Sequence, residues 1–454
     1  MKYEINKERL WIFSPVNHVV IKADISIENK NQKTSNEIIS ESIDINALRE
    51  AIDCAVNSNE VLKSKIVLED DGKAYFVGMQ KANYSVTESG KYWQTIVKEQ
   101  EKIPFDIQNG EYLRFYIIRN VNANEADTTL LLIAHHLAGD GTSYAYLLQD
   151  IIRALNGEKI VIKPVEPFDM SSLPKDSRLG FIMRLMLSSM NKKWRKTGKQ
   201  FTFNEQKEMN SKYWSAHSSY VTVCVFAGST YDSLIAAAKA NRVSVNTVIT
   251  AAFIKAANEC GETNAQDVGH AVSIRKKGYT GMGNFATGIS MKYLYDGNKG
   301  FFENAKCIQK LIYKKINDDK KKYFLLQFMG NITGTLCDAI YFAAVAGYGN
   351  KTALNFCKMF GYDGNPKGIS ITNLTKLPIE KSYGDYEITD FVFVPPLVLN
   401  AKRIIGIASL GNRMEISFCV EDDGSRESNV RFFANAMNTL ESLVSLLPAD
   451  FIEN

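Results

Sequence analysis

The sequence predicts an α/β protein of two domains, and three observations support this prediction. The chain has 454 residues, too many for one ordinary hydrophobic core, which suggests two domains of about 200 residues each. Short strand-like runs alternate with longer segments whose apolar residues repeat at helical spacing. Hydrophobic residues make up 45% of the chain and charged residues 23%, as in soluble globular proteins.

Charge and cysteine content narrow the classes of partner and compartment. The net charge of +4 is mild, whereas a nucleic-acid-binding protein normally carries a stronger and more clustered basic excess, so we expect no nucleic-acid partner. The seven cysteines are odd in number and form no CxxC pair, which favours reduced thiols over disulfides or a metal site. The N-terminus also lacks the apolar region of a signal peptide, so we expect a cytoplasmic protein. From the cysteine pattern we expect no bound metal.

The first half of the chain begins with a predicted helix and hairpin. Residues 44–56 place their apolar side chains on one face of a helix. Residues 61–67 have the pattern of a strand, residues 70–72 that of a turn, and residues 74–77 that of the partner strand. These elements give the first domain a helix that covers a sheet.

Two of the five histidines stand next to one another in the segment HHLAGDG, residues 135–141. The apolar run 130–134 before them predicts a buried strand, and residues 142–155 after them predict a helix. Adjacent side chains of a strand point to opposite faces, so only one of the two histidines faces a given cleft. This arrangement at the end of a strand favours a catalytic site.

Residues 176–220 are predicted to connect the two domains. An apolar run over 181–190 is too short to span a bilayer, which takes roughly 20 residues. The basic segment 192–199 follows it, with Lys192, Lys193, Arg195, Lys196 and Lys199. Two interpretations stay open. We prefer a connecting helix with a solvated basic end and do not expect a membrane-surface protein; the alternative is attachment to a membrane surface or an acidic partner.

The second half again alternates helices and strands. Residues 232–240 predict a helix, and a further helix follows and ends at Gly261. A strand over 269–274 leads to Arg275. The apolar region 323–348 is interrupted by glycine and polar residues, which argues for core or covering helices and against a transmembrane helix.

The last part of the chain completes a sheet. Residues 369–374 predict a strand, and hairpin strands across 392–399 and 404–410, then a strand over 414–420, continue the sheet. A final amphipathic helix carries its apolar residues at helical spacing, namely Val430, Phe433, Met437, Leu440 and Leu443.

The segment 135–141 matches every fixed position of the pattern HHxxxDG and resembles the signature of the CoA-dependent acyltransferase superfamily. This superfamily includes chloramphenicol acetyltransferases, nonribosomal-peptide condensation domains and alcohol acetyltransferases. Residues 104–107 (PFDI) and 283–285 (GNF) are similar to further family segments, although Thr375 stands where the family usually has glycine. The resemblance implies two chloramphenicol-acetyltransferase-like domains, each a mixed sheet with helices, with the active-site tunnel between them.

This resemblance also implies a division of the chain and roles for its residues. The N-terminal domain would span 1–175, the connector 176–220 and the C-terminal domain 221–454. His136 would be the general base and His135 its supporting neighbour, with Asp140 in a structural ion pair with Arg275. The remaining expected site residues are Gly141, where the backbone turns tightly, and Ser370, Thr372 and Asn373, which would meet the oxyanion or the substrate carbonyl.

The expected reaction moves an acyl group from a thioester directly to an alcohol or amine. No Gly-x-Ser-x-Gly elbow or cysteine nucleophile accompanies the histidines, so no covalent acyl-enzyme is indicated. We expect no permanently bound cofactor. The expected co-substrate is acyl-CoA, because the chain carries no adenylation or carrier domain. Two alternatives stay open: a free-standing condensation enzyme that uses phosphopantetheine thioesters on an acyl or peptidyl carrier protein, and a catalytically silent binding module of the same fold.

Overall fold

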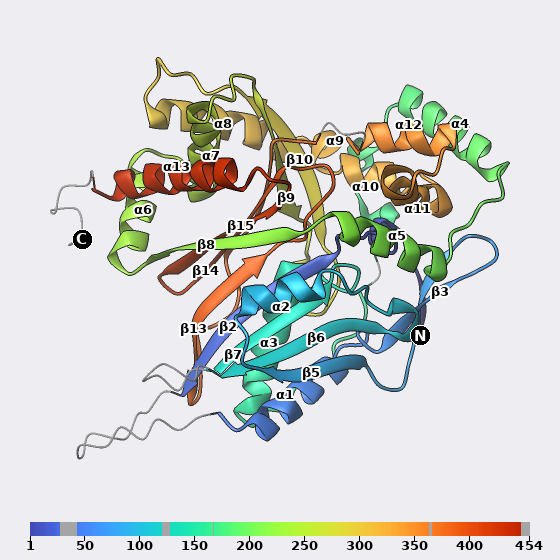
Figure 1. Ribbon diagram of the computed structural model, residues 1–454, viewed down its shortest axis with the longest axis horizontal. Helices are drawn as coiled ribbons and strands as arrows, with labels where there is room; N and C mark the ends of the chain where they lie inside the picture. Colours follow the sequence, from blue (N-terminus) through green and yellow to red (C-terminus); the bar gives the residue numbers. More distant parts are fainter. Residues whose placement is uncertain (28–42, 120–127, 167, 363–365, 446–454) are drawn as a thin grey trace.

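The computed structural model of the protein describes residues 1–27, 43–119, 128–166, 168–362 and 366–445. The described strands form two six-stranded sheets and one three-stranded sheet. Figure 1 shows the two large sheets next to each other, each with its own helices, and a further group of helices beside them. The predicted fold class, α/β with two mixed sheets and covering helices, is therefore confirmed.

The first sheet has the strand order β12-β13-β2-β7-β6-β5. All neighbouring strands are antiparallel except β5 and β6, which are parallel. Its strands are β2 (His18–Ile27), β5 (Asn83–Ser89), β6 (Glu111–Arg119), β7 (Thr128–His135), β12 (Ser382–Tyr383) and β13 (Tyr386–Val394). Its helices are α1 (Ile45–Asn57), α2 (Trp93–Gln100) and α3 (Gly141–Leu155).

Strand β7 lies in the middle of this sheet, and each of its residues is buried. Helices α1 and α3 pack together near β2, while α2 contacts β7 and β8; Figure 1 shows α2 on the near face of the sheet and α1 with α3 behind it. A strand with both faces covered has no solvated side, which explains why its sequence is a continuous apolar run instead of an alternating one. The strand predicted over 130–134 is the centre of β7.

The second sheet has the order β10-β9-β11-β14-β15-β8. Strand β11 runs parallel to both of its neighbours, and the other pairs are antiparallel. Its strands are β8 (Ser219–Ala227), β9 (Gln266–Ser273), β10 (Ala286–Tyr293), β11 (Ile369–Lys376), β14 (Arg403–Leu410) and β15 (Arg413–Glu421). Its own buried apolar cluster, the second core, is built with the helices α6 (Ser229–Ala240), α7 (Val245–Glu259), α8 (Phe301–Ile316) and α13 (Arg426–Ser445).

The small sheet has the order β1-β4-β3, formed by β1 (Lys2–Glu4), β3 (Ser64–Leu68) and β4 (Ala74–Gly78). A helical layer lies beside the two large sheets (Figure 1), and it comprises α4 (Phe181–Arg195), α5 (Phe203–Ala216), α9 (Asp319–Lys322), α10 (Phe324–Met329), α11 (Gly334–Tyr341), η5 (Phe342–Ala346) and α12 (Lys351–Met359). The remaining short helices are η1 (Lys7–Trp11), η2 (Ile107–Asn109), η3 (Met170–Ser172) and η4 (Lys175–Ser177). None of the helices within the described residues is long and apolar enough to cross a membrane.

The chain crosses back from its second half into the first sheet. Strand β13 pairs with β2 along nearly its whole length, from Tyr386 opposite Ile27 to Val394 opposite Val20. The hairpin strand predicted across 392–399 is therefore wrong, because Pro395 follows β13 directly and a proline cannot donate a ladder hydrogen bond. The division of the chain at 176–220 remains a prediction. Residues 382–394, which this division assigns to the C-terminal domain, complete the sheet of the first half.

The first core, which is the buried apolar cluster that contains β2 and β7, extends into the second half along this crossing. Strand β13 contacts β14 and β15, and Ile404 and Ala408 of β14 belong to the same buried cluster as β2 and β7. At Gly406 a Cβ atom would lie 2.5 Å from the carbonyl oxygen of Phe393, so only glycine allows the two sheets to approach this closely. The sheets therefore pack as one unit.

The helical layer is tied to the N-terminus by a buried ion pair. Arg9 of η1 donates from Nε to Asp338 Oδ1 of α11 at 2.7 Å, and a second hydrogen bond joins Nη2 to Oδ2. Both side chains are almost completely buried. Burial raises the pKa of Asp338, whereas the Arg9 charge lowers it. The pair holds η1 against α11.

We expect Asp338→Ala to destabilise the protein by about 3–5 kcal/mol, because it leaves the Arg9 guanidinium buried without a counter-charge. The double variant Arg9→Met/Asp338→Leu removes both charges and should recover most of that loss. Chemical denaturation of the three proteins measures the difference. A single variant as stable as the parent would show that the pair does not hold η1 in place.

Candidate active site

His135 is the last residue of β7, and its side chain is buried. Its Nδ1 accepts a hydrogen bond from the backbone N–H of Leu137 at 3.1 Å, and the Tyr144 hydroxyl donates to its carbonyl oxygen at 2.6 Å. The ring lies edge-on to Phe105, with 5.5 Å between ring centroids. Burial holds the pKa of His135 well below 6.5, so this ring is neutral and held within the first core.

His136 follows the strand and is only partly buried. Its Nδ1 lies 2.9 Å from the carbonyl oxygen of Gly139. A carbonyl oxygen can only accept, so Nδ1 carries the proton and Nε2 keeps its lone pair. No hydrogen bond between described residues uses Nε2. The Trp11 ring of η1 packs against the imidazole at a tilt of 31°, with 4.2 Å between ring centroids, and restricts its orientation.

The surroundings of His136 favour its neutral form. Burial lowers its pKa below 6.5, the Gly139 carbonyl and the Asp140 carboxylate act in the opposite direction, and the Lys7 ammonium lowers it further. Lys7 belongs to η1, and its buried ammonium donates a hydrogen bond to the carbonyl oxygen of Asn284. The net effect leaves His136 as an unprotonated acceptor at neutral pH.

Asp140 is the N-cap residue of α3, and it binds the second half of the chain. Its Oδ1 accepts from the Ser143 N–H at 2.7 Å, which caps the helix, and from Arg275 Nη2 at 2.8 Å. Its Oδ2 accepts from the backbone N–H of Phe285 at 2.9 Å. The carboxylate does not reach His136 Nδ1, whose partner is the Gly139 carbonyl. Asp140 thus organises the loop and does not form a hydrolase-type triad.

Arg275 follows β9 and lies where the sequence placed the partner of Asp140. Its buried guanidinium also donates from Nη1 to the Gly281 carbonyl at 2.9 Å and stands over the Phe285 ring at 4.5 Å. Both ends of the loop between β9 and β10 are therefore held by one cation. Through Asp140 this cation connects the two halves of the chain.

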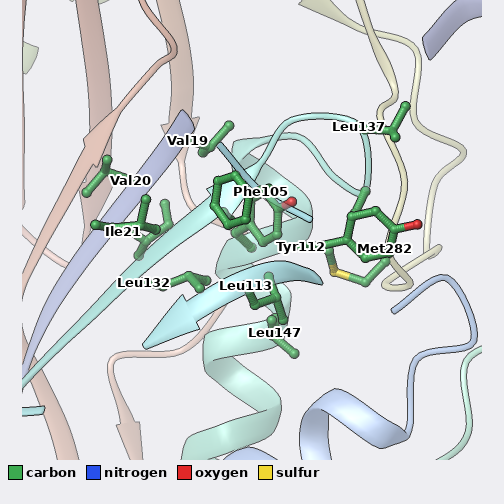
Figure 2. Packing of buried hydrophobic residues seen from close by; sticks show 14 of the residues in the cluster. Val19, Val20, Ile21, Phe105, Tyr112, Leu113, Leu132, Leu137, Leu147 and Met282 are labelled. Atoms are coloured by element: carbon green, nitrogen blue, oxygen red, sulfur yellow. The ribbon is translucent and has the colours of Figure 1, made fainter. Parts of the chain in front are cut away.

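The glycines of the loop allow close contacts. A Cβ atom at Gly139 would lie 2.7 Å from Met282 Cε, and one at Gly141 would lie 2.6 Å from a ring carbon of Phe393. Figure 2 shows Met282 together with Leu137 and Tyr112 in the first core. Gly141 was predicted as a tight turn, whereas it is the first residue of α3, and close packing explains the requirement for glycine.

The three polar residues predicted on β11 divide between its two faces. Asn373 shares a face with Ile371, which lies in the second core, and its Nδ2 donates to Asn246 Oδ1 at 3.1 Å. Ser370 and Thr372 lie on the opposite face, the one that meets the first half. Only these two hydroxyl side chains of the three are directed toward the junction of the halves.

Sequence reasoning missed three residues around His136. Trp11 and Lys7 come from η1, more than a hundred residues earlier in the chain, and the Nδ2 atom of Asn284 lies 3.4 Å from His136 Nδ1. The segment GNF pointed to the neighbourhood of Asn284, but no sequence signal singles out Lys7. Among the described residues no group of His, Cys, Asp and Glu is arranged to hold a metal ion.

Comparison with protein families identifies the class to which this α/β fold belongs. The model described as "Condensation domain" matches residues 31–285, more than half of the chain, and the chain belongs to this family. Members of the family are acyl-transferring enzymes. A search of curated proteins with this chain found no match.

Solved structures share the fold over nearly the whole chain at low identity. The condensation domain of the Monacolin K polyketide synthase MokA is 10% identical, with a TM-score of 0.60 over 98% of both chains. Polyketide synthase associated protein 5 from Mycobacterium tuberculosis is 15% identical, with a TM-score of 0.60 over 99% of this chain and 98% of that one. The starter condensation domain of rhizomide synthetase RzmA, in complex with C8-CoA and Leu-SNAC, is 12% identical, with a TM-score of 0.58 over 100% and 97%.

We expect Asp140→Ala and Arg275→Ala each to lower the free energy of unfolding by about 3–5 kcal/mol, because either change leaves a buried charge without its partner. Lys276→Ala is the matched control. The Lys276 side chain is 73% exposed and pairs with Glu166 at the surface, so its loss should cost less than about 1 kcal/mol. Urea denaturation of the three variants provides the comparison, and parental stability of both buried variants would refute a structural role for the pair.

Proposed function

We propose that this protein transfers an acyl group from acyl-CoA directly to an alcohol or amine, with His136 as the general base. The observation that carries the proposal is the hydrogen bond from His136 Nδ1 to the Gly139 carbonyl at 2.9 Å. It leaves Nε2 as the acceptor of a proton, on a ring whose pKa is lowered from 6.5. Membership of an acyl-transferring family supports the same reaction class.

In the proposed reaction, Nε2 of His136 takes the proton from the acceptor's hydroxyl or amine as its oxygen or nitrogen attacks the thioester carbonyl. The tetrahedral oxyanion then collapses, the carbon–sulfur bond breaks, and the imidazolium returns the proton to the departing thiolate. The products are an ester or amide and free coenzyme A. Because the nucleophile is the acceptor itself, no covalent acyl-enzyme forms.

The other residues take supporting roles in this proposal. His135 and Trp11 hold the loop and the imidazole plane, and the Asp140–Arg275 pair, with Gly141, sets the position of the loop against the second half. We propose that Ser370 and Thr372 meet the substrate carbonyl or its oxyanion. Asn373, whose amide is bonded to Asn246 and Thr375, orients the end of β11 in the same proposal.

Coenzyme A is the proposed donor, and a carrier-bound phosphopantetheine thioester is the second candidate. The RzmA neighbour was solved with C8-CoA, while other neighbours are condensation domains of large synthetases. A catalytically silent module is the third candidate. Release of free thiol from acetyl-CoA with a mixture of alcohols and amines separates the first from the third, and the same assay with an acylated carrier protein identifies the second.

His136→Ala should lower kcat by roughly 10²–10⁴-fold, the usual contribution of a positioned proton acceptor, while the melting temperature and donor binding stay near the parental values. His135→Ala should instead reduce stability, because its ring fills space in the first core, with only a modest change in rate. Thiol release and thermal melting under one set of conditions compare the two. If His135→Ala abolishes turnover and His136→Ala retains it, the base is misassigned.

The rate should remain high as the pH falls to 6.5 and decline only below it. The reason is that the base is active when unprotonated and the pKa of His136 is lowered from 6.5. Lys7→Met removes a cation that depresses this pKa, so the acid limb of the kcat/KM profile should move to higher pH. A pH profile of kcat/KM for both proteins tests this, and identical acid limbs would exclude an effect of Lys7 on the base.

A further inference from the structure

Helix α4 carries an exposed apolar surface that no other part of the described chain covers. Phe181, Ile182, Leu185 and Met186 are between 36% and 83% exposed. They form two pairs with a spacing of four residues, which places them on one face of the helix. Isolated exposed apolar residues are ordinary, whereas a contiguous group of four large ones on one helix indicates a binding surface.

The opposite face of α4 is firmly attached. Leu187 and Trp194 are buried, and Trp194 Nε1 donates to Thr335 Oγ1 of α11 at 2.9 Å. Asn191 donates from Nδ2 to the Asn331 carbonyl at 2.8 Å and accepts from the Thr333 N–H at 2.9 Å. The exposed apolar side chains therefore belong to a well-anchored helix, and their exposure is not the result of a loose segment.

Basic residues predominate in the sequence around this surface, in a segment that lies between Asp176 and Glu205, and Glu205 pairs with Lys199. Residues 177–204 contain seven Lys or Arg and no Asp or Glu. Helix α12, which packs on α4 and lies next to it in Figure 1, adds exposed Lys351, Leu354, Lys358 and Met359 and has no acidic residue either. The positive charge is concentrated here, since the whole chain has a net charge of only +4.

From this combination we infer that α4 and α12 bind the surface of an anionic phospholipid membrane. Apolar side chains on a convex helix face insert between lipid headgroups without a complementary groove, and the flanking lysines and arginines attract anionic headgroups. A second copy of this chain is a poor occupant, because two such basic faces repel one another. This inference favours the surface-attachment interpretation of 192–199 over that of a solvated helix end.

A series of contacts connects the membrane-binding surface with the candidate site. Helix α11 bonds to α4 through Thr335 and to η1 through the Asp338–Arg9 pair, and the Trp11 ring of η1 packs against His136. This inference does not depend on the proposed reaction, since lipid binding is measured without turnover.

The test is co-sedimentation of the full chain with vesicles of phosphatidylcholine alone and with added phosphatidylglycerol. We expect binding to the anionic vesicles, weakened by added salt because the charges are screened. Ile182→Ser/Leu185→Ser should weaken partitioning by about tenfold or more, since two large side chains no longer insert. Lys192→Glu/Lys193→Glu should weaken it as well.

Two control variants match these changes elsewhere on the surface. Val161→Ser/Ile162→Ser replaces side chains that are 75% and 64% exposed, and Lys306→Glu/Lys310→Glu reverses two exposed charges on α8. Both should bind vesicles like the parent, and thermal melting confirms that each variant is folded. Absence of binding to anionic vesicles, equal binding by the α4 variants and the parent, or binding only to an acidic carrier protein would each overturn the inference.

Discussion

The Asp140 carboxylate accepts N–H groups from both halves of the chain: the Ser143 amide at the start of α3, and the Arg275 guanidinium and Phe285 amide from the loop between β9 and β10. A buried carboxylate requires several hydrogen-bond donors, and here these donors come from segments more than 130 residues apart. The position of the signature loop relative to the second half depends on this one group.

The same arrangement positions His136, although its Nδ1 bonds to the Gly139 carbonyl and not to the carboxylate. The loop that Asp140 holds brings the Gly139 carbonyl within 2.9 Å of Nδ1, and the carbonyl decides which ring nitrogen keeps its lone pair. The N-terminal helix η1 supplies the other constraints, with Trp11 against the ring and Lys7 nearby. The orientation of the ring and its protonation state thus both depend on the loop 136–140 together with η1.

The helical layer contacts η1 of the candidate site on one side and is exposed on the other. Its inner side is fixed to η1 by the buried pair of Arg9 and Asp338, and its outer side carries the apolar and basic residues of α4 and α12. The crossing of β13 into the first sheet makes the body of the protein one packed unit behind this layer. The distance and orientation of the His136 imidazole relative to a membrane bound at α4 would then be fixed.

The sequence by itself determined the fold class, the buried strand before the histidines and the helix after them, since local periodicity carries this information. The ion pair of Asp140 with Arg275 was implied only by the resemblance of the HHxxxDG motif to a known family, and in the structure the two side chains lie 2.8 Å apart. Only the tertiary structure decided the destination of β13, the separation of Asn373 from Ser370 and Thr372, and the contacts of Lys7 and Trp11 with His136. These depend on which distant segments meet and on which strand face is buried, and neither follows from residue types within one segment.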